Sequence, residues 1–520
     1  MADIVLINPK FEVSFWGLEH ALPLLGKRAN MPVAALPLIA AVTPAHHRVT
    51  IIDENVEEID FARCAKADIV GLTGMIVQRR RMREILAELR RRKCYTVVGG
   101  PWVSVSENYF DNLVDATFIG EAEETWPQFL QDWEDGKAQR RYEQQEKTDL
   151  SKVPPPRLDL LAMRKYAFGS VQFTRGCPFT CDFCDIIVIF GRRPRLKTSA
   201  QILVELEALR AQKLRFVFIV DDNLIGNKKA IKDILRQVIE WQKENGYPLM
   251  FVTEASVDLA DDAELMTLMV EANISAVFVG IESVNEESLK EARKLQNLRR
   301  GGTLVEKVRR IQDAGMEVWA GMIVGFDNDD EKVFAAQARF LAEARISMAM
   351  IGMLSAIPRT PLYDRLKAAS RLDEADDPAF GTNVLPVNMS REALAQGYVR
   401  LMAEVYEPEA YFARIDDLYR EGRIVTDRAL RAYGANHRWA RVRNDARLWL
   451  ESLGLFLRLM TGIPDARLRR LYGGRFLSFL RHRPDPAAAR IYALKCATHW
   501  HMHQFVGELM NRSRPLVNTY

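Results

Sequence analysis

The run Thr174-Arg175-Gly176-Cys177-Pro178-Phe179-Thr180-Cys181-Asp182-Phe183-Cys184 carries the strongest chemical signal in this 520-residue chain. Its cysteines follow the spacing Cys-x3-Cys-x2-Cys, which brings three thiolates close enough to hold three irons of a [4Fe–4S] cluster. Electron-transfer clusters usually take four cysteines, and a structural zinc site also takes four ligands. The run offers no fourth ligand, so one iron would stay open to a small molecule. A zinc site completed from elsewhere, or three unrelated buried cysteines, are the alternatives.

The composition is that of a folded protein with more than one domain. Hydrophobic residues make up 48% of the chain and charged residues 27%, as in soluble globular proteins, and the length predicts two or three domains. The other three cysteines, Cys64, Cys94 and Cys496, are scattered, which predicts no disulfide framework and a reducing, cytoplasmic setting. The first residues lack the features of a signal peptide. No apolar run approaches the ~18 residues that span a bilayer.

Residues 1–145 alternate β-rich runs with helical patterns, which predicts an α/β domain with a flavodoxin-like (Rossmann-type) parallel sheet. The expected strands are residues 4–7, 49–52, 69–72, 96–98 and 116–119. Three of them end in small residues, which are Thr73-Gly74, Gly99-Gly100 and Gly120-Glu121. Glycines at carboxyl strand ends let a ligand approach the backbone. Alone, this pattern fits a nucleotide, a flavin or no ligand.

A charged, proline-rich linker is expected at residues 146–162, and the alternation restarts in residues 163–395. The expected strands there are residues 170–175, 216–220, 250–254, 276–282, 317–323 and 348–354. Six β/α units predict a partial TIM-like (β/α)6 barrel, in which chemistry takes place at the carboxyl ends of the strands. The cysteine run lies at the end of the first strand. Residues 396–520 are expected to form a mostly α-helical, arginine-rich domain.

The cysteine spacing and the predicted barrel resemble the radical S-adenosylmethionine (SAM) superfamily, whose open iron chelates SAM. The resemblance implies that Cys177, Cys181 and Cys184 hold the cluster. It also implies a SAM site at the strand ends, for which the candidates are Phe183, Asp222, Glu254, Glu282, Ser283 and Gly325. Helix capping and loop solvation account equally well for any single polar residue of this set.

Beside such a barrel, the first domain resembles the cobalamin-binding domain of class B radical SAM methylases. The resemblance implies a cobalamin site at the strand-end residues Thr73, Gly74, Gly99, Gly100, Gly120 and Glu121. Cobalamin domains that ligate cobalt through histidine carry Asp-x-His-x-x-Gly, which this sequence lacks. We therefore expect cobalamin to be bound without a histidine ligand.

Residues 184–198, 220–230 and 358–362 resemble the subgroup that contains hopanoid C-2 methylases. The implied activity is methyl transfer to an unactivated carbon of a hopanoid, another lipid or a secondary metabolite, through a 5′-deoxyadenosyl radical and methylcobalamin. No catalytic residue is assigned. The alternatives are a class B enzyme without methyl transfer, of the anaerobic cyclase or oxidoreductase type, and a cobalamin- or redox-sensing protein. Arg192, Arg193, Arg195 and Lys197 fit either an anionic partner or a solvated loop.

Residues 421–520 hold 17 Arg and 1 Lys against 4 Asp and 3 Glu, a net charge of +11, although the whole chain carries only +3. The apolar run at residues 448–460 is too short to span a bilayer and fits a core or interfacial helix. We expect a small-molecule or lipid substrate, an electron donor such as flavodoxin or ferredoxin, and no nucleic acid. The basic region fits a helical subdomain packed on the barrel, and the alternative is peripheral contact with the inner face of the cytoplasmic membrane.

Overall fold

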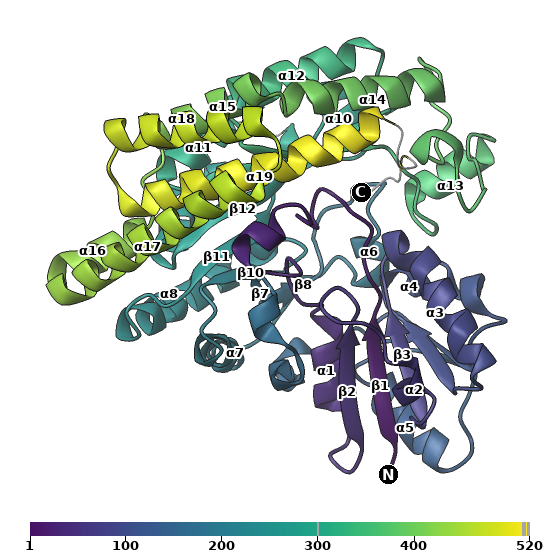
Figure 1. The fold of residues 1–520 in the computed structure, drawn as a ribbon. Helices are drawn as coiled ribbons and strands as arrows, with labels where there is room; N and C mark the ends of the chain where they lie inside the picture. Colours follow the sequence, from purple (N-terminus) through teal and green to yellow (C-terminus); the bar gives the residue numbers. More distant parts are fainter. Residues whose placement is uncertain (299–300, 512–515, 517–520) are drawn as a thin grey trace. The chain divides into compact units, whose positions relative to one another are not determined.

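The computed structural model describes residues 1–298, 301–511 and 516, and the chain forms two compact units (Figure 1). The first unit comprises Met1–Val13, Arg28–Gly226 and Ala356–Arg365. The second unit comprises Ser14–Lys27, Asn227–Ser355 and Leu366–Tyr520.

The first unit contains a six-stranded parallel sheet in the order β2-β1-β3-β4-β5-β6. Its strands are β1 (Asp3–Asn8), β2 (Arg48–Asp53), β3 (Ile69–Thr73), β4 (Thr96–Gly99), β5 (Ala116–Ile119) and β6 (Arg141–Glu143). The sequence did not predict β6, because Arg-Tyr-Glu is short and polar. Only Tyr142 of this edge strand is buried, and its ring stacks on Phe118 of β5 at 5.4 Å.

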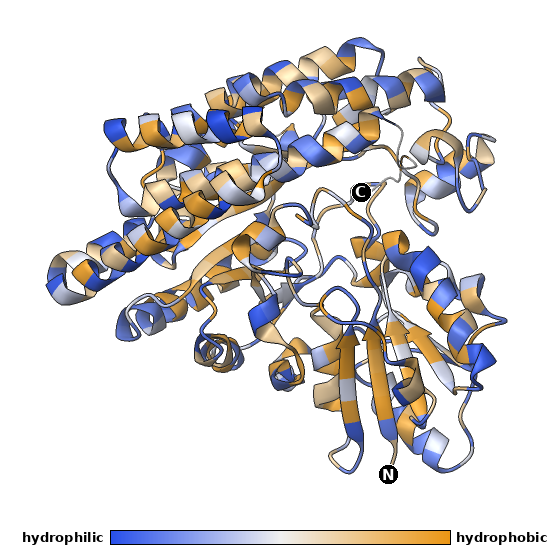
Figure 2. Ribbon diagram, viewed as in Figure 1, coloured by the Kyte–Doolittle hydropathy of each residue, from blue (hydrophilic) through white to orange (hydrophobic). Residues whose placement is uncertain are grey.

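Helices cover both faces of this sheet. Helices α1 (Ala35–Val42) and α5 (Thr125–Glu134) share a core with Ile4 and Leu6 of β1. Helices α2 (Phe61–Cys64), α3 (Arg79–Arg91) and α4 (Pro101–Val105) share the opposite core with Val5 and Ile7. Successive side chains of a strand point to opposite faces. The central strands are largely apolar in Figure 2, with hydrophilic residues mainly at strand ends, which is typical of a sheet buried on both sides.

The first unit also holds the start of the second α/β region. It contains β7 (Gly169–Val171), β8 (Thr174–Arg175), α6 (Ile186–Ile189), β9 (Arg195–Leu196), α7 (Ser199–Ala211) and β10 (Phe216–Ile219). The strand expected at residues 170–175 is interrupted, because β7 pairs with β10 whereas β8 pairs antiparallel with β9. Asp221 accepts hydrogen bonds from the N–H groups of Phe173 and Thr174 and so replaces the neighbouring strand there.

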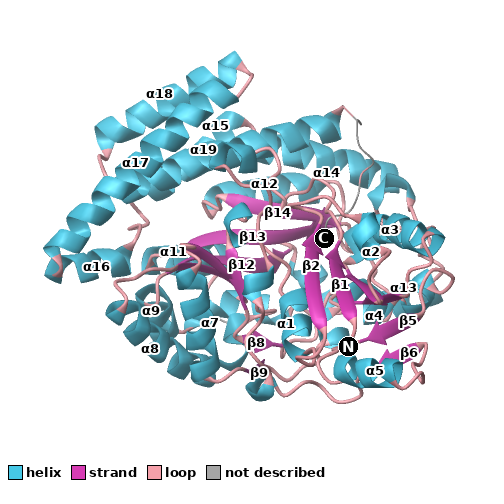
Figure 3. Ribbon diagram, turned by 60° about the horizontal axis from the view of Figure 1, so that its bottom comes forward, coloured by secondary structure: helices cyan, strands magenta, loops and turns pink. Residues whose placement is uncertain are grey.

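The second unit continues with four parallel strands in the order β11-β12-β13-β14, of which β12 to β14 lie side by side in Figure 3. The strands are β11 (Met250–Ala255), β12 (Ile274–Glu282), β13 (Glu317–Val324) and β14 (Met348–Met353). Their helices are α8 (Lys228–Glu244), α9 (Ala263–Glu271), α10 (Glu286–Glu291), α11 (Leu304–Ala314) and α12 (Lys332–Glu343). At β14, the hydroxyl of Tyr406 accepts from the N–H of Ala349 and donates to its carbonyl.

The rest of the second unit is helical, as expected. Its helices are α14 (Arg391–Val405), α15 (Pro408–Ile415), α16 (Arg428–Asn436), α17 (Arg438–Gly462), α18 (Ala466–His482) and α19 (Pro486–Met510). Helix α13 (Pro361–Ala368) precedes them and belongs to the first unit up to Arg365. The buried carboxylate of Glu317 on β13 pairs with Lys495 of α19 and accepts a hydrogen bond from Tyr419. Burial would raise the pKa of Glu317, but the Lys495 charge holds it below its ordinary value.

Candidate functional site

The three cysteines lie in the loop between β8 and α6. Cys181 is buried, and Cys177 and Cys184 are half-buried. Burial raises the pKa of the Cys184 thiol well above its ordinary value, and the nearby charge of Asp185 adds to this. A bare thiol is therefore held protonated, whereas a bound metal keeps a cysteine as thiolate. Three sulfur donors without a fourth in the loop fit a [4Fe–4S] cluster with one open iron.

The backbone of the cysteine loop is fixed from its N-terminal side. Gly176 has φ +96°, and a Cβ there would lie 3.0 Å from the carbonyl oxygens of Gly191 and Arg193. Its N–H donates to the carboxylate of Asp222 at 2.6 Å. Burial raises the pKa of Asp222 to about 6. Asp222, a predicted SAM ligand, thus holds the residue that precedes Cys177.

The loop is also held from the chain segment of residues 356–365. The N–H of Leu362 donates to the carbonyl of Asp182 at 3.0 Å, and Arg365 lies 3.5 Å from the Asp182 carboxylate. Phe183, a predicted SAM residue, is half-exposed beside Asp182. The stretch at residues 358–362 therefore contacts the cysteine loop and helps to hold its backbone.

The other four predicted SAM residues lie at the carboxyl edge of the second unit's sheet. Glu254 is half-exposed near the end of β11. Glu282 ends β12 with φ +62° and accepts from Lys294 at 2.7 Å. Ser283 Oγ accepts from the N–H of Asn285, and Gly325, with φ +102°, follows β13. The structure groups these four residues in one unit, and Phe183 and Asp222 in the other.

A cavity of about 500 Å³ opens at the carboxyl edge of the first unit's sheet. Five of the six predicted cobalamin residues line it, namely Thr73, Gly99, Gly100, Gly120 and Glu121. The sixth, Gly74, adjoins Thr73, and a Cβ there would lie 2.5 Å from Met82 Sδ. Apolar side chains that the sequence did not single out complete the lining, among them Leu6, Leu36, Phe118 and Trp126. No histidine occurs among the described residues of this lining.

A glycine is required at the mouth of this cavity. Gly100 has φ +99°, and a Cβ there would lie 2.3 Å from Thr73 Oγ1. A Cβ on Gly99 would lie 3.3 Å from the Cβ of Phe118. The cradle is thus open only while these positions lack side chains, which fits close approach of a bulky, flat ligand to the backbone.

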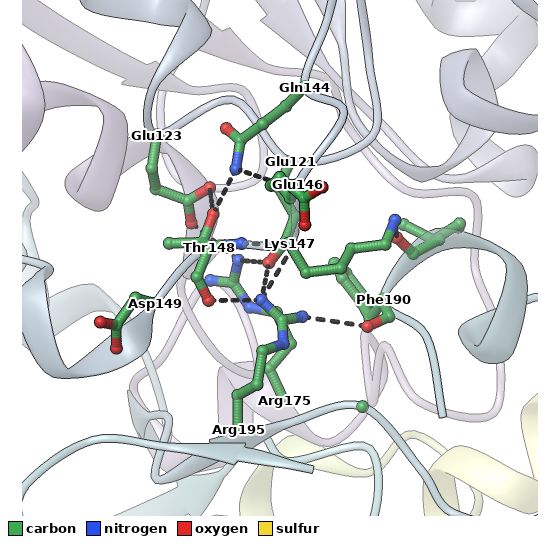
Figure 4. Close-up of polar contacts among 12 residues, drawn as sticks. Glu121, Glu123, Gln144, Glu146, Lys147, Thr148, Asp149, Arg175, Phe190 and Arg195 are labelled. Atoms are coloured by element: carbon green, nitrogen blue, oxygen red, sulfur yellow. Dashed lines mark hydrogen bonds and ion pairs between the residues drawn. The ribbon is translucent and has the colours of Figure 1, made fainter. Parts of the chain in front are cut away.

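Two glutamates and two arginines form a buried charged cluster (Figure 4), and three of them, Glu121, Glu123 and Arg175, line this cavity. Arg175 pairs with Glu121 and, at 2.7 Å, with Glu123. Arg195 Nη1 donates to both oxygens of Glu121 at 2.9 Å. Thr148 donates its N–H to Glu121 and its hydroxyl to Glu123. Both carboxylate oxygens of Glu121 are therefore engaged by protein groups.

The charged cluster holds two positive and two negative side chains, and all four are largely buried. Side-chain exposure is at most 14% for its four charged members. Burial would raise the pKa of Glu123, but the adjacent Arg175 charge holds it below its ordinary value.

The sequence left two interpretations of the basic run before α7, an anionic partner or a solvated loop. Arg195 and Lys197 face Glu121 and Glu205, whereas Arg192 and Arg193 are exposed.

Comparison with known proteins identifies the domains and the family. Residues 28–130 match the B12 binding domain, residues 171–339 the radical SAM superfamily, and residues 360–514 a domain of unknown function, DUF4070. The chain is 41% identical to an uncharacterized methyltransferase, sll1242, of Synechocystis sp., over 79% of this chain and 77% of that protein. It is 34% identical to the hopanoid C-2 methylase of Rhodopseudomonas palustris, over 79% of this chain and 78% of that protein. The chain belongs to the cobalamin-dependent radical SAM methyltransferases.

Solved structures support the fold of this methyltransferase. TsrM from Kitasatospora setae, with cobalamin and a [4Fe–4S] cluster bound, matches with a TM-score of 0.58 at 16% identity, over 78% of this chain and 82% of that one. OxsB with aqua-cobalamin bound matches with a TM-score of 0.61 at 15% identity, over 99% of this chain and 80% of that one. The predicted fold class, enzyme class and cofactors are confirmed: the methyltransferase uses a [4Fe–4S] cluster, SAM and cobalamin. The cyclase and sensor alternatives are set aside.

Proposed function

We propose that this methyltransferase methylates an unactivated carbon of a hopanoid-like lipid. The observation that supports this most directly is the 34% identity to a hopanoid C-2 methylase over 79% of the chain. That similarity reaches beyond the residues around the cofactors, because the B12 and radical SAM matches end at residue 339. A soluble secondary metabolite is the competing substrate.

Within this proposal, Cys177, Cys181 and Cys184 hold the cluster. SAM lies against Phe183, Glu254, Glu282, Ser283 and Gly325, and Asp222 holds the loop through Gly176 at 2.6 Å. When bound, the cluster and SAM supply the radical, and cobalamin supplies the methyl group. The chain's own part is to orient these groups and to exclude water and stray hydrogen donors.

Cobalamin is proposed to occupy the cavity of the first unit. Thr73, Gly74, Gly99, Gly100 and Gly120 form its cradle, and the apolar lining excludes water. Glu121 is proposed to position Arg175 and Arg195 rather than to contact the cofactor, since both its oxygens are engaged. The functional domains are proposed to be residues 1–145, 163–395 and 396–520, with a linker at 146–162.

Two partners complete the proposal. A reductant such as flavodoxin or ferredoxin would supply the electron that the cluster requires. A lipid substrate barely leaves the bilayer, so the arginine-rich C-terminal domain is proposed to contact the inner face of the cytoplasmic membrane. Among the described residues no helix is both long and apolar enough to cross a membrane, so any contact would be peripheral.

The experiment offers two substrates to one enzyme. Anaerobically reconstituted protein receives SAM, methylcobalamin and a reductant, with either a detergent-dispersed hopanoid or tryptophan, and products are analysed by mass spectrometry. The proposal predicts a hopanoid heavier by one methylene unit, absent with Cys181→Ala. Methylation of tryptophan alone, or of neither compound, contradicts it.

A further inference from the structure

Helix α17 carries two apolar faces, and the described residues cover only one of them. Leu448, Ser452, Leu455 and Leu459 are buried against the rest of the second unit. The opposite face consists of Trp439, Val442, Ala446, Leu450, Leu453 and Leu457, named here the α17 stripe, and all six residues are exposed. They follow one another at steps of three or four residues, which places them on one side of the helix.

The exposure of the stripe is large. Trp439 is 85% exposed, Leu450 72% and Leu457 62%. Scattered exposed apolar residues are ordinary, but a continuous row of large ones marks an interaction surface. The apolar run seen in the sequence at residues 448–460 therefore divides between the two faces, and only half of it belongs to a core.

Exposed arginines lie on α17 itself and on the neighbouring helix α18. Arg443 is exposed one residue beyond Val442. Helix α18 packs beside α17 through Phe456 and Phe476, whose rings stack at 4.7 Å, and its exposed face carries Arg467, Arg470 and Arg481. Among the described residues, none of these four arginines forms an ion pair with an acidic side chain, although the charge of Arg467 helps to lower the pKa of Asp465. Residues 438–482 hold ten arginines against three acidic residues, and Figure 2 shows hydrophilic and hydrophobic residues mixed along both helices.

The charges select the occupant of this surface. A second copy of the chain would bring its own arginines against these, and like charges across an interface are unfavourable. An anionic bilayer satisfies both features, because leucine and tryptophan enter the interfacial region while arginines reach the lipid phosphates. We propose that the α17 stripe, with Arg443, Arg467, Arg470 and Arg481, is the surface by which the enzyme lies on an anionic membrane. This deepens, and rests on, the proposed lipid substrate.

The binding test uses the full-length protein and vesicles of defined composition. Co-sedimentation is measured with phosphatidylcholine vesicles and with vesicles that also contain phosphatidylglycerol, at low and high salt. We expect binding to the anionic vesicles at low salt and release as salt screens the attraction. Absence of binding to anionic vesicles at low salt overturns the inference.

Two sets of variants locate the contact. Leu450→Ser with Leu453→Ser and Leu457→Ser should weaken binding by about tenfold per residue. The matched control is Val204→Ser with Leu295→Ser and Val387→Ser, which are also exposed but lie on other elements. Binding to anionic vesicles should weaken about fivefold for each arginine that is changed to Gln, at Arg443, Arg467, Arg470 and Arg481. Their control, the same loss of charge at Lys66, Lys93, Lys229 and Lys332, should have little effect.

The outcomes separate this inference from the proposed function. Equal weakening by stripe and control variants overturns the inference, as does a dimer that the stripe variants convert to monomer in sedimentation velocity. If detergent-dispersed hopanoid is methylated but vesicles are ignored, the surface assignment fails and the substrate stands. If vesicles bind through the stripe but no hopanoid is methylated, the substrate fails and the surface stands.

Discussion

Arg175 and Glu121 form an ion pair with side chains only 8% and 1% exposed, and this pair joins the residue before the cysteine loop to the end of β5. Glu121 lines the cavity proposed for cobalamin, whereas Arg175 precedes Gly176 and Cys177. The pair therefore fixes the cluster loop relative to the cavity within a single compact unit. Loss of either charge of the pair is therefore expected to affect both the cysteine loop and the cavity.

Removing Glu121 tests this link. Glu121→Ala leaves Arg175 and Arg195 with one carboxylate between them, and breaking a buried pair costs ~3–5 kcal/mol. We expect a loss of that order in the free energy of unfolding, measured with urea, and reduced iron content after reconstitution. Glu124→Ala, at an exposed glutamate three residues on, is the control. Equal stability and iron content in both variants would contradict the link.

The cobalamin cradle makes a steric prediction. Gly99→Leu should abolish retention of hydroxocobalamin, because its Cβ alone would lie 3.3 Å from Phe118 and the rest of the side chain would fill the cradle. Retention is measured from the absorption spectrum after desalting. Gly507→Leu, a helical glycine with nothing within 4 Å, should retain the cofactor. In the unaltered protein, nitrogen hyperfine splitting from a histidine on Co(II) would contradict our assignment of the site.

Two buried histidines predict acid sensitivity. Burial lowers the pKa of His499 and of His501 to about 3 from the ordinary value of 6.5. Tyr472 and the carbonyl of Tyr406 contact the two ring nitrogens of His499, which suits the neutral ring. The unfolded chain binds protons below pH 6.5 and the folded chain does not, so stability falls as pH drops from 6.5 toward 3.

The slope of this loss is ~1.4 kcal/mol per pH unit for each histidine. Urea unfolding at pH 7.5, 6.5 and 5.5 measures it. His499→Gln should reduce the slope between pH 6.5 and 5.5, whereas His437→Gln, at an exposed histidine, should not. An unchanged slope in His499→Gln contradicts the assignment.

The Lys495–Glu317 pair predicts how the helical region is anchored. Lys495→Met leaves a buried carboxylate without its cation, at a cost of ~3–5 kcal/mol. Hydrogen exchange should then rise in α19 and β13 together. Adding Glu317→Gln should restore part of the loss, because the uncompensated charge is removed. If the double variant exchanges as fast as Lys495→Met, the anchor is not electrostatic.

The parts of the fold that the sequence predicted are those with a local signal. Uniformly apolar strands and strand-end glycines such as Gly99 and Gly100 can be recognised from residue type alone. The cysteine triplet is equally local. The α17 stripe was hidden, because the sequence shows an apolar run and only the structure tells which of its residues face outward.

The charged cluster could not have been predicted from local pattern. Glu121 and Arg195 are 74 residues apart, and nothing near either residue indicates its partner. Arg195 belongs to the same basic run as Arg192, which is exposed. The difference arises from the pairing of β8 with β9, which turns Arg195 toward Glu121. Tertiary contacts decide which arginine of a basic run forms a buried ion pair, so the sequence alone does not predict it.

The measurement that tests the account most directly follows the methyl group. Anaerobically reconstituted enzyme should hold about four irons and four sulfides, and with SAM deuterated at the methyl group it should yield 5′-deoxyadenosine and a hopanoid carrying the label. Cys181→Ala should yield neither product. Stoichiometric zinc in a fully stable protein, with no 5′-deoxyadenosine formed, would contradict the account.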